Sequence, residues 1–336
     1  MTRDDLIGYI FRGSTHKPSR RLSGLLHDCP RFSTFVELNR DKIRKKIRCA
    51  MGKEDLCDVL AELRVACLLL IDDRIILKYE TYGSRIRTPD LTAVFMKSVN
   101  LNVEVARIRR SQMSTRYAKW CQGLRDRISI ADWDIRLDER QASLKLIEKL
   151  EQSTEQIAQF VRSKIVNDGR SMPTDAMSEH PVEGFENELT LILFAGPLGL
   201  KQDCTRYASA RSIAYKQDEY LKLRDVVVDK LGQARPGMIN VIFVICEDEG
   251  FNPPDLDWGM ESLFRALSQG DPTFTAKVQK RFRTLEEFKA QFPELSAVVL
   301  RSEWREPNVL WQNPLARNSL PLALHQYLSQ IDHPFA

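Results

Sequence analysis

Residues 89–108 read PDLTAVFMKSVNLNVEVARI, and this stretch decides the fold. It contains two strand-like runs, Asp90–Lys97 and Leu101–Ile108, separated by a short connection. Pro89 stands just before the first run, where a proline removes no interior hydrogen bond of a sheet. A third strand-like run, Arg74–Glu80, precedes them. Residues 74–108 therefore predict a three-stranded meander.

Two helices are predicted ahead of this meander. The first begins at the capping-box pattern Thr34-x-x-Glu37 and runs to about Ala50. The second spans Glu54–Leu70, because apolar residues recur there at spacings of three and four. Glu62 lies off the centre of that apolar stripe. The N-terminal part of the chain is thus expected to be helical.

Residues 111–185 look like an insertion into the core. Trp133–Leu137 has the pattern of a short strand, and Asp138 can cap a long helix that reaches about Val166. The polar segment 167–186 predicts a loop. We expect a mainly helical elaboration here.

The chain after the insertion returns to an alternation of helix and strand. An apolar strand is predicted at Glu188–Ala195, an amphipathic helix at Lys216–Ala234 and a buried strand at Ile239–Cys246. The remaining predicted elements are helices at Asp257–Leu267, Thr284–Phe292 and Leu320–Ser329 and strands at Leu295–Arg301 and Asn308–Gln312. A helix followed closely by a buried strand favours an α/β fold with a mixed sheet. We expect an N-terminal helical segment at 1–53 and one α/β domain at 54–336.

Amino-acid composition excludes fewer classes of protein than the predicted order of helices and strands does. The 336 residues carry a net charge of +4, although basic residues cluster at 40–48 and again at 107–119. For either cluster taken alone, a solvated surface explains the charges better than phosphate contacts do, although two clusters that flank a candidate site favour phosphate contacts slightly more. No apolar run approaches the roughly 20 residues that a membrane span requires. We therefore expect no membrane association. The seven cysteines are scattered and form no CxxC pair, so we also expect a reducing cytoplasm and no zinc site.

The order of these elements resembles the PD-(D/E)XK nuclease superfamily, and the likeness covers the sheet core. That resemblance implies a restriction-endonuclease-like fold, a mixed central sheet flanked by helices, here with a helical insertion. Matched residue by residue, Asp90 takes the family's aspartate, Glu104 its glutamate and Glu62 the acid of its first helix. Ala106 falls where the family carries its catalytic lysine.

The resemblance also implies a chemistry. Asp90 and Glu104 would hold Mg²⁺ or Mn²⁺ through carboxylate oxygens, and the substrate would be a nucleic acid, with DNA expected. Strand residues two apart project from the same face, so Ala106 shares a face with Glu104. Arg107 points the other way and cannot replace the lysine.

A lysine elsewhere could take over its role. Lys230 and Gln233 lie one turn apart near the end of the helix predicted at 216–234, and this arrangement resembles a motif that some family members use beside the metal. The same residues are equally well explained as the polar end of an amphipathic helix. A positioned proton-handling group contributes about 10²–10⁴-fold to a rate, so its replacement matters.

Two functions remain open from the sequence. In the first, the chain is a metal-dependent nuclease that uses Asp90, Glu104, Glu62, Lys230 and Gln233. In the second, which Ala106 favours, it is a non-catalytic nuclease-like module that binds nucleic acid or a protein partner through residues 111–185. The sequence leaves the oligomeric state open.

Overall fold

The computed structural model describes residues 1–12, 17–80, 89–109, 112–128, 133–137, 143–167, 177–194, 219–247, 253–269, 278–302 and 308–330. The chain divides into two compact units. The first comprises Met1–Ile108, Tyr220–Glu247 and Pro253–Ala336, and the second comprises Arg109–Glu219 and Asp248–Asn252. The second unit therefore extends beyond the predicted insertion of 111–185. The predicted N-terminal segment 1–53 belongs to the same unit as the main sheet.

The first unit contains a six-stranded mixed sheet with the strand order β1-β2-β3-β7-β8-β9. Its strands are β1 (Ile75–Tyr79), β2 (Leu91–Phe95), β3 (Val99–Ile108), β7 (Ile239–Cys246), β8 (Leu295–Ser302) and β9 (Val309–Gln312). The first three form the predicted antiparallel meander. Strand β7 runs parallel to both β3 and β8, and β9 is antiparallel to β8. The α/β class and the mixed sheet are thus confirmed.

Strand β7 lies inside the sheet, and all eight of its residues are buried. A strand that is covered on both faces needs a continuous apolar run, which explains the sequence INVIFVIC. Complete burial of a valine or isoleucine side chain contributes roughly 1.5–3 kcal/mol. This strand therefore anchors β3, its neighbour, on which Glu104 lies.

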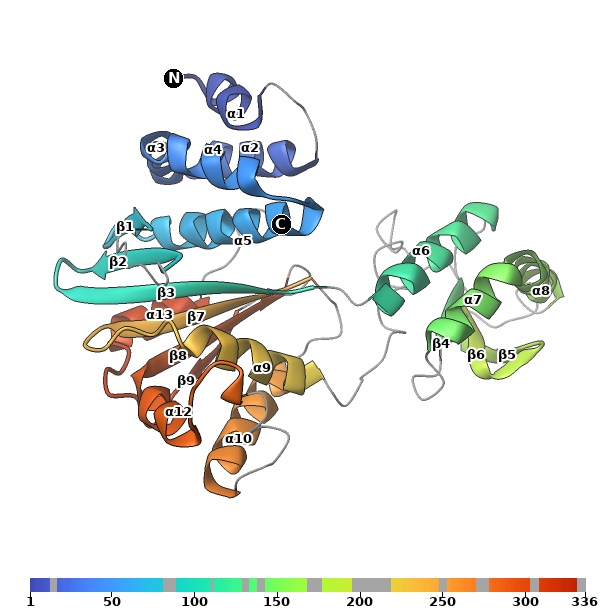
Figure 1. The fold of residues 1–336 in the computed structure, drawn as a ribbon. Helices are drawn as coiled ribbons and strands as arrows, with labels where there is room; N and C mark the ends of the chain where they lie inside the picture. The colour runs from blue at the N-terminus through green and yellow to red at the C-terminus, as the bar shows by residue number, and fades with distance from the viewer. Residues whose placement is uncertain are drawn as a thin grey trace. The chain divides into compact units, whose positions relative to one another are not determined.

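Helices cover both faces of the sheet (Figure 1). Helix α5 (Lys53–Leu70) packs on one face, and the N-terminal helices stack against it. These are α1 (Arg3–Phe11), α2 (Lys17–Asp28), α3 (Pro30–Leu38) and α4 (Arg40–Cys49). The C-terminal helix α13 (Leu322–Gln330) shares the same apolar core. The other face carries α9 (Glu219–Leu231), α10 (Pro253–Gln269) and α12 (Leu285–Gln291).

The N-terminal helices differ from the prediction in one respect. The expected helix beginning at Thr34 is two helices, because the chain breaks at Asn39 between α3 and α4. Helix α3 already begins at Pro30, a favourable first helical residue. Thr34 therefore lies inside α3, where its hydroxyl donates to the Pro30 carbonyl at 3.2 Å instead of capping a helix. The predicted capping box is wrong.

The second unit has its own sheet and core. Strands β4 (Trp133–Leu137), β5 (Met177–Val182) and β6 (Phe185–Phe194) pair antiparallel in the order β4-β6-β5. Its helices are α6 (Gln112–Arg127), α7 (Leu144–Gln152) and α8 (Thr154–Asn167). A compact apolar cluster formed by these elements shows that this unit buries its own core.

Three predictions for this unit need correction. The long helix is divided at Ser153 into α7 and α8, and Ser143 caps α7; Asp138, the predicted cap, lies outside the described residues. Part of the predicted loop is strand β5. The strand predicted at 188–195 is β6, which pairs within this second sheet.

None of the helices in the described ranges combines the length and the apolar character needed to cross a membrane. The six cysteines in those ranges are all free thiols.

Candidate metal centre

Strand pairing brings Asp90 and Glu104 together. The pairing of β2 with β3 ends at Leu91 opposite Val103. Just beyond it, Asp90 Oδ2 accepts a hydrogen bond from the Val105 N–H at 2.9 Å, so the side chain continues the ladder where the backbone pairing stops. Glu104 lies between these two β3 residues and is only 2% exposed. The Asp90 carboxylate is thus held beside a buried glutamate.

Lys230 supplies a cation to both carboxylates. It lies in the last turn of α9, and its Nζ is 2.8 Å from Asp90 Oδ2 and 3.3 Å from Glu104 Oε2. The second oxygen of Glu104, Oε1, is buried and has no hydrogen-bond partner among the described residues. Lys230 thus lies within ion-pair distance of both acids, as a relocated lysine would require.

Gln233 does not occupy the predicted position on the helix. Helix α9 ends at Leu231, and Gln233 follows in a turn in which its N–H donates to the Lys230 carbonyl at 2.9 Å. Its own carbonyl accepts a hydrogen bond from the Asn102 amide at 3.2 Å. Asn102 also donates to Asn240 Oδ1 at 2.9 Å. The backbone of Gln233 thus ties the end of α9 to the sheet, which helps to position Lys230.

Glu62 lies close enough to Asp90 to feel its charge, and it has a cation of its own. Lys46 Nζ contacts Glu62 Oε2 at 2.6 Å and Glu80 Oε1 at 3.2 Å, and the Tyr79 hydroxyl donates to Glu62 Oε2 at 3.1 Å. Lys46 was only one of several basic residues in the sequence cluster at 40–48. The four-residue spacing of Lys42 and Lys46 put both on one face of a helix, but nothing local in the sequence indicated which face meets Glu62.

Arg107 confirms the predicted alternation of β3. Its side chain is 3% exposed and forms ion pairs at 2.7 Å with Glu54 and Asp58 of α5 and with Glu247. Helix α5 covers the face of the sheet opposite to α9, so Arg107 does not reach Lys230 or Glu104. It stabilises the packing of α5 on β3 instead.

Burial controls the charge of these acids. Burial and then the neighbouring Asp90 charge raise the pKa of Glu104 to about 8, against the opposing effect of Lys230. Burial and the Asp90 charge likewise raise the pKa of Glu62 to about 7, against Lys46. Glu104 and Glu62 therefore retain protons near neutral pH, and a cation that binds to either carboxylate would displace its proton.

These shifts predict how stability depends on pH. Between pH 4.5 and 8, folded Glu104 holds a proton that the unfolded chain has released, so the free energy of unfolding falls as the pH rises through this window. The free energy of unfolding of the metal-free protein can be measured with urea on both sides of this window. The difference between Glu104→Gln and the wild type should favour the variant more at pH 9 than at pH 5. A difference between the two proteins that does not change with pH would contradict the raised pKa.

The residues fit a hard divalent cation to a limited extent. No cluster of three or more histidine, cysteine, aspartate or glutamate side chains suited to a metal ion occurs in the described residues. The two carboxylates of Asp90 and Glu104 nevertheless converge, and Glu104 Oε1 is an unused buried acceptor. Mg²⁺ is commonly held by only one or two carboxylates together with waters and substrate phosphates. The donor set suits Mg²⁺ or Mn²⁺ bound in that manner.

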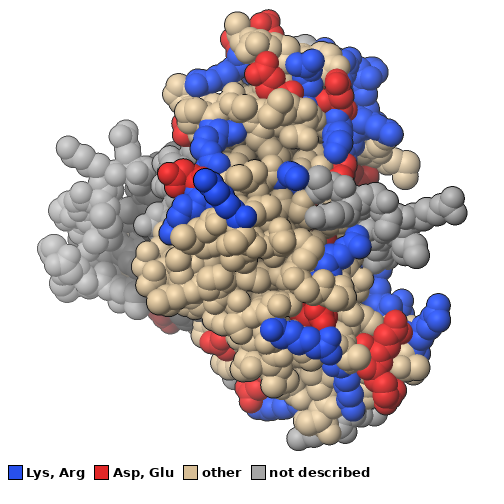
Figure 2. Space-filling view, turned by 90° about the vertical axis from the view of Figure 1, so that its left-hand side faces the viewer, with Lys and Arg blue, Asp and Glu red and all other residues tan. Residues whose placement is uncertain are grey.

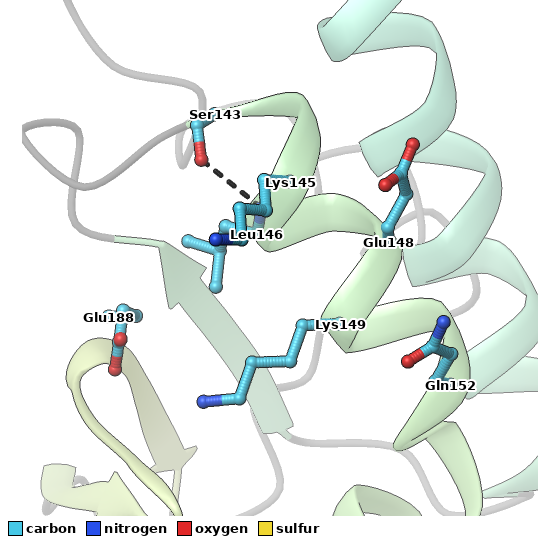
Figure 3. A pocket seen from close by; sticks show the side chains of 7 residues that line it. All are labelled: Ser143, Lys145, Leu146, Glu148, Lys149, Gln152 and Glu188. Atoms are coloured by element: carbon cyan, nitrogen blue, oxygen red, sulfur yellow. Dashed lines mark hydrogen bonds between the residues drawn. The ribbon is translucent and has the colours of Figure 1, made fainter.

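The second unit offers an open pocket of about 500 Å³, which is less suited to chemistry. Figure 3 shows Lys149 pointing toward the hairpin strand that carries Glu188, while Glu148 and Gln152 point away. Lys149 Nζ already donates to the Gly184 carbonyl at 3.3 Å and lies 4.3 Å from the centre of the Phe185 ring. Ser143 is used as the cap of α7. These contacts give the pocket a structural explanation.

Comparisons of the chain with protein-family models, with characterised proteins and with solved structures found no match.

Proposed function

We propose that this chain is a divergent metal-dependent nuclease of the PD-(D/E)XK type that acts on DNA and has moved its lysine from strand β3 to helix α9. The observation that carries the proposal is the position of Lys230 Nζ, 2.8 Å from Asp90 and 3.3 Å from Glu104. Ala106 leaves no lysine on β3, and Lys230 supplies a positive charge to the same two acids. The geometry thus supports a relocated lysine better than a lost one.

The topology supports a restriction-endonuclease-like fold. Helix α5, the meander β1-β2-β3, helix α9 and strand β7 follow one another in the order that the sequence resemblance implies, apart from the second unit between β3 and α9. The parallel pairing of β7 with β3 completes this arrangement. Fold by itself does not establish function, so the proposal depends on the site.

Each residue of the site would have a distinct role. Asp90 and Glu104 would hold Mg²⁺ or Mn²⁺, which when bound polarises a phosphodiester and lowers the pKa of the attacking water. Lys230 stabilises negative charge beside the two acids and can orient a water molecule. Glu62, with its pKa near neutrality, can take up a proton close to the site. Lys46 keeps the Glu62 side chain in place.

Cleavage assays test this proposal directly. Purified protein should cut labelled duplex DNA in the presence of Mg²⁺ or Mn²⁺ and should not cut it in EDTA. Single-stranded DNA and RNA, tested in parallel, would define the preferred substrate. Failure to cleave any of these substrates with either metal would reject the proposed function.

A second function, a non-catalytic binding module, is favoured by one observation. Lys230 already neutralises part of the charge of Asp90 and Glu104, so the buried group is stable without a metal ion. In that case the protein would bind nucleic acid or a protein partner, with the second unit as a contact surface. Absence of cleavage together with salt-dependent DNA binding would favour this function.

A further inference from the structure

Four arginines gather where α1 packs against α4. Arg40, Arg44 and Arg48 recur at every fourth residue of α4 and so form one row along the helix. Arg12 ends α1 in the left-handed conformation, with φ of 58°. We call Arg12, Arg40, Arg44 and Arg48 the arginine row. Figure 2 shows Lys and Arg side chains gathered at the upper right, over the N-terminal helices, with some acidic side chains among them.

Tyr9 of α1 organises this row. The guanidinium carbon of Arg44 lies 4.1 Å from the centre of the Tyr9 ring, and that of Arg40 lies 6.0 Å from it. The Tyr9 hydroxyl donates to Asp41 Oδ1 at 2.6 Å, which fixes the ring and occupies the nearby carboxylate. The N–H groups of a guanidinium lie in its own plane. When the guanidinium stacks on an aromatic ring, these groups point away from the ring and can bind an anion.

Within the described ranges, no carboxylate neutralises the charge of the row. No ion pair joins any of its four members to a carboxylate in the described parts of the chain, and the buried Nε of Arg44 has no hydrogen-bond partner there. Burial and then the charges of Arg12 and Arg44 lower the pKa of Arg48. An anion that binds between these side chains would relieve their mutual repulsion.

The lysines of the same helix behave differently. Lys42 donates to the Tyr79 carbonyl at 3.0 Å, and Lys46 pairs with Glu62. Helix α4 thus uses Lys42 and Lys46 for contacts within the protein, whereas Lys45 is exposed, and it leaves its arginines available on another side. Because an α-helix is roughly 10 Å across, a ligand on the row lies about one helix width from Lys46.

We propose that the arginine row binds the phosphodiester backbone of a nucleic acid. A planar guanidinium donates two parallel hydrogen bonds to one phosphate, and a row of them suits a polymer of phosphates. An anionic membrane would require only a local excess of positive charge, without the ring contact that orients Arg44. The choice of nucleic acid as the polymer rests on the proposed function, but the arginine row is a separate surface from the candidate metal centre.

The test measures binding without cleavage. Fluorescence anisotropy of a labelled DNA duplex in EDTA, over a series of salt concentrations, gives the affinity and its salt dependence. The variant Arg12→Gln/Arg48→Gln changes two exposed side chains. Its matched control, Arg283→Gln/Lys289→Gln, removes the same charge from exposed positions beside and on α12.

We expect the row variant to bind at least about tenfold more weakly at low salt, with the slope of log affinity against log salt reduced by about 2. The control should resemble the wild type. Arg44→Gln should reduce the slope by about 1, provided that circular dichroism shows an unchanged melting temperature. Because binding is measured in EDTA, the absence of cleavage with Mg²⁺ or Mn²⁺ would leave this result intact, so a failure of the nuclease proposal and a failure of this one can be distinguished.

Three results would overturn the proposal. The wild type could fail to bind DNA, the row variant and the control could lose the same affinity, or the row variant could keep its DNA binding and lose binding to phosphatidylserine vesicles. The last result would assign the row to a membrane surface.

Discussion

Replacing Asp90 by asparagine is expected to lower metal-dependent cleavage at least about a thousandfold. A bound metal ion contributes several kcal/mol to stabilising the transition state, and each 1.36 kcal/mol corresponds to a factor of ten in rate. The substitution removes one of the two charges that would hold the ion, but the asparagine oxygen can still accept the Val105 N–H. The fold should therefore persist.

Initial cleavage rates and Mn²⁺ affinity by calorimetry check this expectation together. Both should fall in Asp90→Asn, whereas Asp73→Asn, an exposed aspartate in the turn before β1, should leave both unchanged. Cleavage by Asp90→Asn at the wild-type rate would exclude Asp90 from the site. It would also show that the observed Asp90–Lys230 contact has only a structural role.

Replacing Lys230 by methionine is expected to lower the cleavage rate by about 10²–10⁴-fold, the usual contribution of a positioned proton-handling group. Methionine keeps an unbranched side chain of nearly the same length and removes the charge. Lys289→Met on α12 provides the control, because Lys289 is exposed. Full activity of Lys230→Met would contradict the proposed relocation of the lysine.

The relocation can also be reversed. Position 106 shares a strand face with Glu104, and Ala106 is partly exposed, so a lysine there can extend toward the same acids. The double variant Ala106→Lys/Lys230→Met should recover at least about tenfold of the activity that Lys230→Met loses. A folded double variant, judged by its melting temperature, that gains nothing would indicate that Lys230 acts by some means other than its charge at this site.

The core of the fold was predictable because its signals are local. The seven apolar residues of the eight in β7, the helical periodicity of α5 and the meander around Pro89 each follow from the chain's own pattern, and the structure confirms all three. The strand predicted at Trp133–Leu137 is confirmed in the same way. The fold class followed from these elements.

The errors arose where a local motif was given too much weight. The Thr34-x-x-Glu37 pattern occurs inside α3, whose start is set by Pro30. Strand β5 was missed because its polar residues and Pro181 resemble a loop. An edge strand tolerates both, and β5 is at the edge of its sheet.

The candidate site was predictable in part. The family resemblance pointed to Asp90 and Glu104, and the register of β2 and β3 brings these two residues together. The approach of Lys230 depends on where α9 ends, and that position is fixed by the hydrogen bond of Asn102 to Gln233, a contact between residues far apart in the sequence. Lys46 and Tyr79 were missed because only the packing of α4 and β1 around α5 brings them to Glu62.

The most direct test of the central claim is a crystal structure of the protein soaked with Mn²⁺, with anomalous diffraction recorded for the metal. If Asp90 and Glu104 bind a metal ion, we expect an anomalous peak between their carboxylates, with Lys230 Nζ displaced from the position between them. A structure in which Lys230 keeps both contacts and no peak lies between the two acids would contradict the central claim.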